Sequence, residues 1–217
     1  GYLGMTTLEE QSWCHYYMNS HYTGAGAAVE LGCFLGSLTL PLAEGLKTAV
    51  EKGRLNPDSH RIHSHDLFYF HHSFFEALGS HPLKNRMTEG QWFFEVFEQN
   101  VAHLRDWIEP YWVDLGKATW EGGVIELLLL DCMKYDTITN NVLQQFYPAL
   151  KPGVSTIVQQ DYFHFYEWWT HLLTFEQRDL LEIMEEVPHS GMLVLKVVGD
   201  LAAECAQRDP NRSFNRV

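Results

Sequence analysis

The segment Val29-Glu30-Leu31-Gly32-Cys33-Phe34-Leu35-Gly36 decides the fold that this sequence predicts. It contains the end of a short apolar stretch, residues 27–31, followed by two glycines in a Gly-x-x-x-Gly pattern. Glycines in the turn after a first strand let the backbone approach a ligand, and the helix that follows offers free N–H groups. The pattern differs from the Gly-x-Gly-x-x-Gly that holds a dinucleotide pyrophosphate. Taken alone, the segment fits a nucleotide-binding turn or an ordinary turn, so its surroundings decide between the two.

Strands and helices alternate on both sides of this segment. Helices are expected at residues 6–22, 37–52 (with Ser37 as N-cap and Pro41 in the first turn), 89–106 and 137–150. Further strands are expected at residues 61–64, 110–115, 125–130 and 154–159. The nearly all-apolar run 125–130 is typical of a parallel strand that is covered on both faces. Finally, residues 181–187 and 192–198 flank a Pro-His-Ser-Gly turn and predict a β-hairpin.

This order of elements predicts an α/β fold, a Rossmann-like doubly wound sheet that is mostly parallel and carries a C-terminal antiparallel hairpin. The 217 residues fit one domain. Within that domain, residues 1–22 are expected to form an N-terminal helix, residues 68–88 a lid loop over the site, and residues 207–217 a frayed polar tail.

Composition narrows the range of partners. The chain has 28 acidic and 15 basic residues and a formal charge of −13, which argues against a nucleic acid. Its apolar runs are too short for a membrane span. Four widely spaced cysteines fit a reducing, cytoplasmic setting better than a disulfide framework or a zinc site. We therefore expect a small-molecule or carrier-bound substrate; a homodimer is one alternative for the oligomeric state, and the start at Gly1 suggests a trimmed or excised chain.

Acidic and amide side chains follow two of the expected strands. Asp131 comes directly after residues 125–130, and Gln160 and Asp161 come directly after residues 154–159. Neighbouring parallel strands lie about 5 Å apart, and their carboxyl ends meet on the ligand side of such a sheet. Hard divalent cations such as Mg²⁺ prefer oxygen ligands of this kind. Acids at strand ends also cap helices or orient loops, so the spacing permits a metal without requiring one.

Residues 29–39, read as Val-Glu-Leu-Gly-Cys-Phe-Leu-Gly-Ser-Leu-Thr, resemble the first motif of the class I S-adenosylmethionine (SAM) methyltransferases. The similarity is to the small-molecule O-methyltransferases related to catechol O-methyltransferase. It implies that SAM is bordered by Glu30, Gly32, Cys33, Phe34, Gly36 and Ser37. Asp66 and Leu67 fall where the family binds the ribose, and a carboxylate accepts from two hydroxyls at once. Gly116, Lys117 and Ala118 fall where the family contacts adenine, although Lys117 departs from the acid that many relatives carry there.

Residues 129–137 resemble the catechol O-methyltransferase segment in which a metal-binding aspartate is followed three residues later by a lysine base. This implies that Asp131 binds metal and borders SAM, and that Lys134 is a general base. Gln160-Asp161-Tyr162 resembles the element that supplies the other ligands in metal-dependent catechol and macrolide-sugar methyltransferases. Gln160 replaces an acid there, which lowers the charge of the site and weakens Mg²⁺ or admits Mn²⁺ or Fe²⁺.

Several histidines and aromatic residues lie near these motifs. His164 and His171 follow Asp161, and we expect either to assist as a base or as a further ligand. The aromatic residues after Asp161 belong either to the core or to the wall of an acceptor site. The remaining histidines, among them His60, His63, His65, His71 and His72, show no ligand spacing and are expected at the surface or in loops.

Together the motifs predict a SAM-dependent O-methyltransferase that uses a divalent cation, Mg²⁺ before Mn²⁺ or Fe²⁺, in natural product biosynthesis. A metal lowers the pKa of a coordinated hydroxyl, and a nearby cation helps a lysine lose its proton. Three alternatives stay open: a nicotinamide-dependent oxidoreductase, a non-catalytic subunit of the same fold, and a metal-dependent oxygenase. The glycine pattern and the hairpin argue against the first, and the retained Asp131, Lys134 and Asp161 argue against the second. Gln160 keeps the third open.

Overall fold

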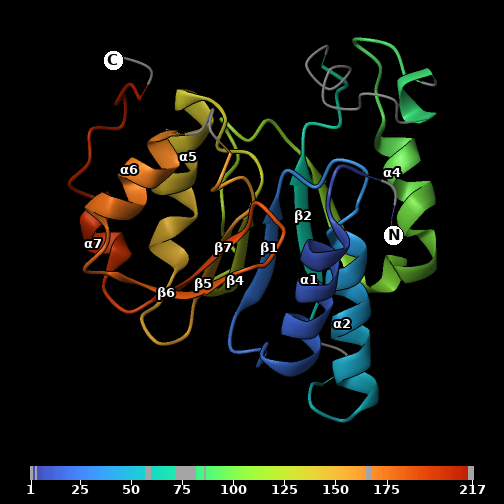
Figure 1. Cartoon of the computed structure of the whole chain (residues 1–217), viewed down its shortest axis with the longest axis horizontal. Coiled ribbons are helices and arrows are strands. Elements are labelled where there is room, and N and C mark those ends of the chain that lie inside the picture. Colours follow the sequence, from blue (N-terminus) through green and yellow to red (C-terminus); the bar gives the residue numbers. More distant parts are fainter. Residues whose placement is uncertain are drawn as a thin grey trace.

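The computed structural model describes residues 2, 4–56, 60–71, 82–85, 87–164 and 168–214. In this part of the chain a seven-stranded sheet has the order β3-β2-β1-β4-β5-β7-β6 (Figure 1). The strands are β1 (Ala27–Leu31), β2 (Ile62–Asp66), β3 (Ile108–Trp112), β4 (Ile125–Leu130), β5 (Thr156–Gln159), β6 (Leu181–Glu186) and β7 (Leu193–Val197). β1 to β5 pair in parallel, and β7 runs antiparallel between β5 and β6. The predicted fold class is confirmed.

Helices cover both faces of the sheet (Figure 1). One face carries α1 (Leu8–Ser20), α2 (Thr39–Glu51) and α4 (Phe94–Val101), and the other carries α5 (Asp136–Gln145), α6 (Trp168–Glu176) and α7 (Leu201–Cys205). Short 3₁₀ turns are η1 (Pro82–Asn85), η2 (Ala102–Trp107) and η3 (Tyr147–Ala149). None of the described helices has the length and apolarity that a membrane span requires.

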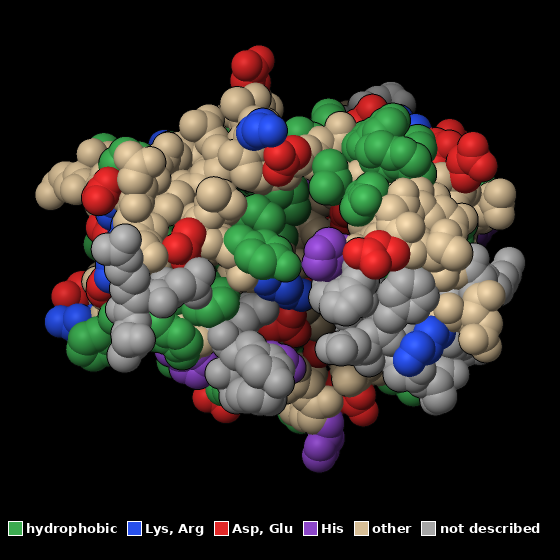
Figure 2. All heavy atoms as spheres, turned by 90° about the horizontal axis from the view of Figure 1, so that it is seen from above, with side chains coloured by type: hydrophobic (Ala, Val, Ile, Leu, Met, Phe, Trp, Pro, Cys, Tyr) green, Lys and Arg blue, Asp and Glu red, His purple; other side chains and the backbone are tan. Residues whose placement is uncertain are grey.

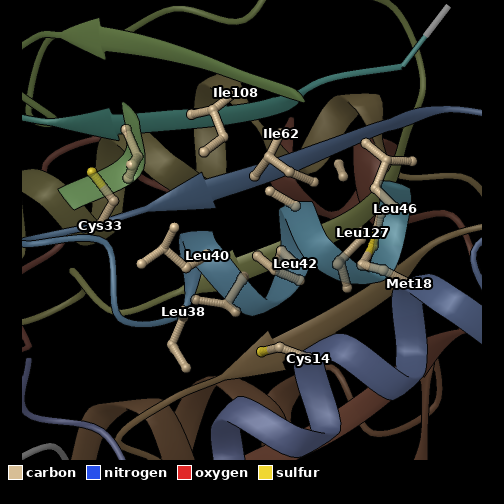
Figure 3. Close-up of a cluster of buried hydrophobic side chains, with 14 of the residues drawn as sticks. Cys14, Met18, Cys33, Leu38, Leu40, Leu42, Leu46, Ile62, Ile108 and Leu127 are labelled. Atoms are coloured by element: carbon tan, nitrogen blue, oxygen red, sulfur yellow. The ribbon is translucent and has the colours of Figure 1, made fainter. Parts of the chain in front are cut away.

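The two hydrophobic layers explain why β4 is apolar at every position. Leu127 and Leu129 face the cluster formed with α1, α2 and α4, whereas Leu128 and Leu130 face the cluster formed with α5, α6 and α7. Successive strand residues point to opposite faces, so a central strand with both faces covered needs no polar side. Figure 3 shows part of the first cluster, where leucines of α2 lie beside side chains of the sheet and of α1.

Several predicted boundaries are corrected. The strand expected at residues 110–115 is β3, which ends at Trp112. The helix expected from residue 89 begins at Phe94, because a turn with Gly90 at φ +80° and a bridge between Tyr69 and Trp92 precede it. Leu38 rather than Ser37 is the N-cap of α2, and it makes no side-chain capping bond. The strands expected at residues 27–31 and 125–130 coincide with β1 and β4.

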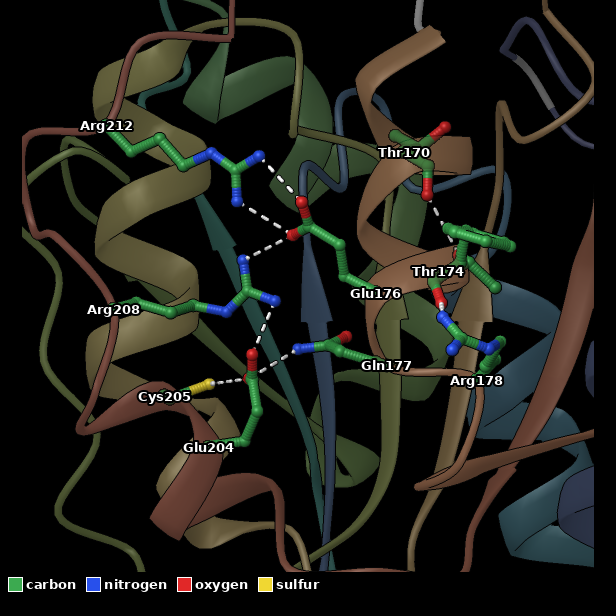
Figure 4. Close-up of polar contacts among 10 residues, drawn as sticks. Thr170, Thr174, Glu176, Gln177, Arg178, Glu204, Cys205, Arg208 and Arg212 are labelled. Atoms are coloured by element: carbon green, nitrogen blue, oxygen red, sulfur yellow. Dashed lines mark hydrogen bonds and ion pairs between the residues drawn. The ribbon is translucent and has the colours of Figure 1, made fainter.

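The C-terminal segment 207–214 is docked rather than frayed, which overturns the expectation for this part of the tail. Arg208 and Arg212 both pair with Glu176 of α6, at 3.1 and 2.7 Å (Figure 4). Phe214 is 2% exposed, and its N–H donates to the Asp136 carboxylate at 3.1 Å. The polar composition of the tail therefore reflects specific partners on α5 and α6.

The loop predicted as a lid, residues 68–88, is only partly described, since residues 72–81 and 86 lie outside the described part of the chain. At its start, Phe68 and Phe70 are fully buried. Their backbone groups bond with residues 90–93, which attaches this end of the loop to the segment before α4. The beginning of the expected lid is thus part of the hydrophobic core.

Candidate functional site

Most of the predicted site residues gather where β1, β2, β4 and β5 end, whereas Gly116, Lys117 and Ala118 follow β3. Backbone bonds hold these strand ends in register: Asp131 N–H donates to Leu31 O, and Gln160 N–H donates to Leu130 O, both at 2.9 Å. The edge lies at the top of Figure 1 and faces the viewer in Figure 2, where acidic and basic side chains lie together near the centre beside hydrophobic ones. Ligands of open α/β sheets bind at this edge.

The glycine turn after β1 depends on backbone conformations that favour glycine. Gly32 has φ +93° and Gly36 has φ +90°. A Cβ on Gly32 would collide with the carbonyl oxygen of Asp131, so this glycine allows the turn to lie directly against the end of β4. Gly36 N–H closes the turn on Cys33 O at 2.8 Å, and Gly36 O accepts from Leu40 N–H at the start of α2.

Glu30 ties three elements together beneath this turn. Its side chain is 1% exposed, and Oε2 accepts hydrogen bonds from Thr39 at 2.6 Å and from Ser64 at 2.8 Å. Burial raises the pKa of Glu30 to about 7, although the two hydroxyl donors act in the opposite direction. Glu30 thus joins β1, β2 and α2 and also lines the cavity beside the turn.

Asp66 links the ends of β1 and β2. Its Oδ2 accepts from Phe34 N–H and its Oδ1 accepts from Phe68 N–H, both at 2.8 Å. Burial raises the pKa of Asp66 against the effect of these backbone donors. Each carboxylate oxygen accepts more than one hydrogen bond, so both keep capacity for ribose hydroxyls. Leu67 follows and is 42% exposed, and its contact with the cofactor stays a prediction.

Asp131 and Asp161 meet at one basic side chain. Lys134 Nζ lies 2.9 Å from Asp131 Oδ1 and 2.9 Å from Asp161 Oδ2. Burial raises the pKa of Asp131, with the Lys134 charge acting against it. Burial lowers the pKa of Lys134, but the two carboxylates outweigh this effect and raise it above that of an ordinary lysine. In this geometry Lys134 keeps its proton, because its close neighbours are anions rather than the expected cation. Its role as a base stays a prediction.

Gln160 contributes an oxygen that the fold leaves unbonded. The residue is 4% exposed, and Oε1 has no hydrogen-bond partner among the described residues. Burying an unpaired carbonyl is costly, so this oxygen is available to a hydrogen-bond donor or an ion. Gln160 lines one cavity together with Asp131 and Asp161, and three oxygens from adjacent strand ends suit a divalent cation. Among the described residues no cluster of three His, Cys, Asp or Glu side chains forms a metal site.

The cavity beside the glycine turn is small, at about 70 Å³. Ligand pockets usually have roughly 300–1,000 Å³, so a nucleotide cofactor needs more room than this cavity gives. Met5 and Thr6 form part of its wall. They precede the first helix and belong to no strand or helix. No motif in the sequence indicates these two residues, because the contact joins segments that are distant along the chain.

Asp114 is an acid after β3 that the predicted site does not include. Because β3 ends at Trp112 rather than at residue 115, Asp114 is the acid that follows the strand. Its carboxylate accepts from Gly116 N–H at 3.0 Å and pairs with Lys117 at 3.1 Å. Gly116 is half-buried and Ala118 is buried, whereas the Lys117 side chain is 82% exposed. The strand expected at residues 110–115 included Asp114, so this acid was not recognised as a residue that follows the strand.

The structure places three of the histidines in different surroundings. His164 is exposed in the turn after β5, where its N–H donates to Asp161 O at 2.9 Å. His171 stacks on the Tyr162 ring, and its Nε2 bonds the Tyr162 carbonyl at 2.5 Å, so this nitrogen is occupied as a donor. His65, expected at the surface or in a loop, is 3% exposed in β2, and burial lowers its pKa to about 4.

A second cavity, of about 630 Å³, lies on the sheet away from the glycine turn. Its lining includes the rings of His63, Tyr111 and Trp120 and, from the loop after β3, Lys117 and Ala118, two of the residues predicted to bind the cofactor. His63 and His65 point to the face opposite Ser64, and therefore opposite Glu30. This cavity includes none of the carboxylates at the strand ends.

Comparisons with known proteins identify the fold. No protein-family model matches the sequence, and no curated protein matches it. The solved O-methyltransferase NovP is similar, with a TM-score of 0.63 and 13% identity over 88% of this chain and 79% of NovP. Cofactor-bound Rv0187 from MTB has a TM-score of 0.54 and 14% identity, over 89% of this chain and 81% of that one. SAH-bound PaMTH1, a methyltransferase of Podospora anserina, has a TM-score of 0.53 and 13% identity, over 88% and 78%. The chain thus has the fold of the class I SAM-dependent methyltransferases.

Proposed function

We propose that this chain is a SAM-dependent O-methyltransferase whose acceptor is a small-molecule or carrier-bound hydroxyl. The observation that carries the proposal is the convergence of the glycine turn, Asp66 and the Asp131–Lys134–Asp161 cluster at one edge of the sheet. The solved O-methyltransferase NovP has a similar fold, which supports the same assignment.

The cofactor end of the site is formed by the chain's own anions and backbone groups. Glu30 and the turn from Gly32 to Gly36 border the space for the methionine part of SAM, as the resemblance of this segment implies. Asp66 offers carboxylate oxygens to the ribose, and we assign Asp114 to the adenine edge in place of Lys117. The carboxylates also suit the positive charge of SAM.

For the acceptor end we propose a cation site formed by Asp131, Gln160 and Asp161. Bound SAM supplies a methyl group activated by positive sulfur, and a bound divalent cation lowers the pKa of an acceptor hydroxyl. The chain's part is to orient that hydroxyl in line with the methyl group and to exclude water. The exposed ring of Phe163, directly after the Asp161 turn, offers a flat surface for the acceptor.

Cofactor binding tests the proposal first. Calorimetric titration of the full chain with SAM and with NAD distinguishes the methyltransferase from a nicotinamide-dependent oxidoreductase. We expect SAM to bind and NAD not to bind. Binding of NAD without SAM would refute the proposal.

Substitution of Asp131 tests the chemistry. With radiolabelled SAM and a panel of catechols and hydroxylated sugars as acceptors, we expect Asp131→Ala to abolish methyl transfer, because the acceptor hydroxyl loses its charged neighbour. SAM affinity should stay within about threefold of the unchanged protein, roughly 0.7 kcal/mol. The matched control is Asp179→Asn, an exposed acid just before β6, at the opposite edge of the sheet. Full transfer by Asp131→Ala, or unchanged transfer after removal of metal with EDTA, would exclude the cation from the reaction.

A further inference from the structure

The cation site already contains a positive charge of the chain itself. Lys134 Nζ is equally distant from Asp131 and Asp161, at 2.9 Å from an oxygen of each. Within the described residues, the ion pairs of these two carboxylates all involve Lys134. Two carboxylates brought together by adjacent strands repel each other, and the ammonium between them offsets that repulsion.

The two carboxylates and the ammonium differ in how firmly the fold holds them. Asp131 and Asp161 follow β4 and β5 directly, and backbone bonds at residues 131 and 160 tie those ends to the neighbouring strands. Lys134 lies in the irregular segment before α5, and its side chain is 41% exposed. A long lysine side chain with an open path to water can leave its partners without any change in the sheet.

The Lys134 ammonium pairs with the two carboxylates of the site but not with the side-chain oxygen of Gln160. Gln160 lines the same cavity, and its buried Oε1 has no hydrogen-bond partner among the described residues, the Lys134 ammonium included. A divalent cation takes six or more oxygen ligands and would give this oxygen a partner. The ammonium pairs with the two carboxylates and leaves the oxygen of Gln160, which lines the same cavity, without a partner.

We infer that Lys134 is an internal competitor of the divalent cation: it closes the cation site in the metal-free protein and swings into solvent when the ion binds. This inference rests on the proposed function, because it concerns the same cation site. Its consequence is that the ion binds more weakly than the two carboxylates alone would allow. Metal binding is thereby coupled to a movement of Lys134.

Metal affinity is the first test. The full chain, freed of metal with EDTA, is titrated with MgCl₂ and with MnCl₂ by calorimetry. We expect Lys134→Met to bind either ion at least about tenfold more tightly than the unchanged protein, because no ammonium has to be displaced. The matched control is Lys47→Met, which removes a lysine of similar exposure, 46%, that pairs with Glu51 on α2. Its affinity should be unchanged. Lys134→Gln repeats the test if the methionine variant does not fold.

Lysine labelling of the unchanged protein gives a second readout. An amine-reactive ester followed by mass spectrometry measures the accessibility of Lys134 with and without MnCl₂. We expect the ion to increase the labelling of Lys134 severalfold and to leave Lys47 unchanged.

The outcomes separate this inference from the proposed function. Equal or weaker ion binding by Lys134→Met, or labelling of Lys134 that falls with the ion, overturns the inference while SAM binding still supports the methyltransferase. Failure of both proteins to bind an ion overturns the inference and removes the metal from the proposed function. Loss of SAM binding in the unchanged protein would overturn the proposed function itself.

Discussion

At the scale of single residues, Glu30 joins β1, β2 and α2 and lines the cavity beside the glycine turn. Its pKa rises from 4.5 to about 7 on folding, so the folded protein holds this proton more tightly than the unfolded chain. Stability is therefore highest below the unfolded pKa and falls as the pH rises toward 7, by about 3 kcal/mol for a difference of this size.

Glu30→Gln should remove this pH dependence, since the amide is neutral and its oxygen still accepts from Thr39 and Ser64. Urea unfolding of both proteins between pH 4.5 and 8 gives their free energies of unfolding. As the pH rises over this range, the variant should gain about 3 kcal/mol of stability relative to the unchanged protein. The control is Glu51→Gln, at an exposed glutamate of α2. A difference that does not change with pH would contradict the assignment.

Gly32 is the second residue for which the structure gives a definite expectation. Gly32→Ala should lower the free energy of unfolding by at least about 3 kcal/mol, because the new Cβ meets the Asp131 carbonyl and φ is positive. Gly53→Ala is the matched control: its φ is +72° and nothing lies within 4 Å of the new Cβ, so it isolates the conformational cost of about 1 kcal/mol. Equal losses in urea unfolding would show that the close approach to β4 is unimportant.

At the scale of elements, the docked tail depends on α6. Glu176 receives Arg208 and Arg212, and the tail then reaches Asp136 at the start of α5. The arginines favour the charged form of Glu176 and lower its pKa. The tail therefore connects α6, the helix before the hairpin, to the start of α5.

Glu176→Gln should loosen this tail without unfolding the domain. Hydrogen exchange of residues 207–214 should become at least about tenfold faster, whereas the free energy of global unfolding should fall by no more than about 1 kcal/mol, since these ion pairs are partly exposed. Glu186→Gln, at an exposed position of β6, is the control. Unchanged exchange in the tail would show that Phe214 alone holds it.

At the scale of the whole molecule, the net charge of −13 predicts that the acceptor is not a nucleic acid. Phosphate binding requires a basic surface, and acidic residues outnumber basic ones by 28 to 15. In a gel-shift titration with mixed tRNA at low salt, we expect no complex up to about 100 µM, the upper range of non-specific binding. A complex that weakens steeply with salt would overturn this expectation.

The sequence by itself determined the order and type of most elements. β1 and β4 have the predicted bounds, and the hairpin has the predicted orientation, because local apolar patterns and turn residues specify them. The same patterns placed Asp66, Asp131 and Asp161 at one edge of the sheet, since parallel strands share a carboxyl end. Helix α6 and the end of β3 were not specified in this way: α6 is apolar on most sides, and Pro110 and aromatic side chains obscure the strand end.

Only the tertiary structure decided how the site is occupied. It placed Lys134 between Asp131 and Asp161, brought Met5 and Thr6 to the cavity, and docked the tail on Glu176. Lys134 and Asp131 are only three residues apart, but whole elements separate Lys134 from Asp161 and Glu176 from Arg212, and Met5 and Thr6 are far along the chain from most of the residues that line the cavity. Local propensity specifies a strand and the face to which its side chains point. The position of the Lys134 ammonium between two strand ends depends instead on packing and charge from several segments.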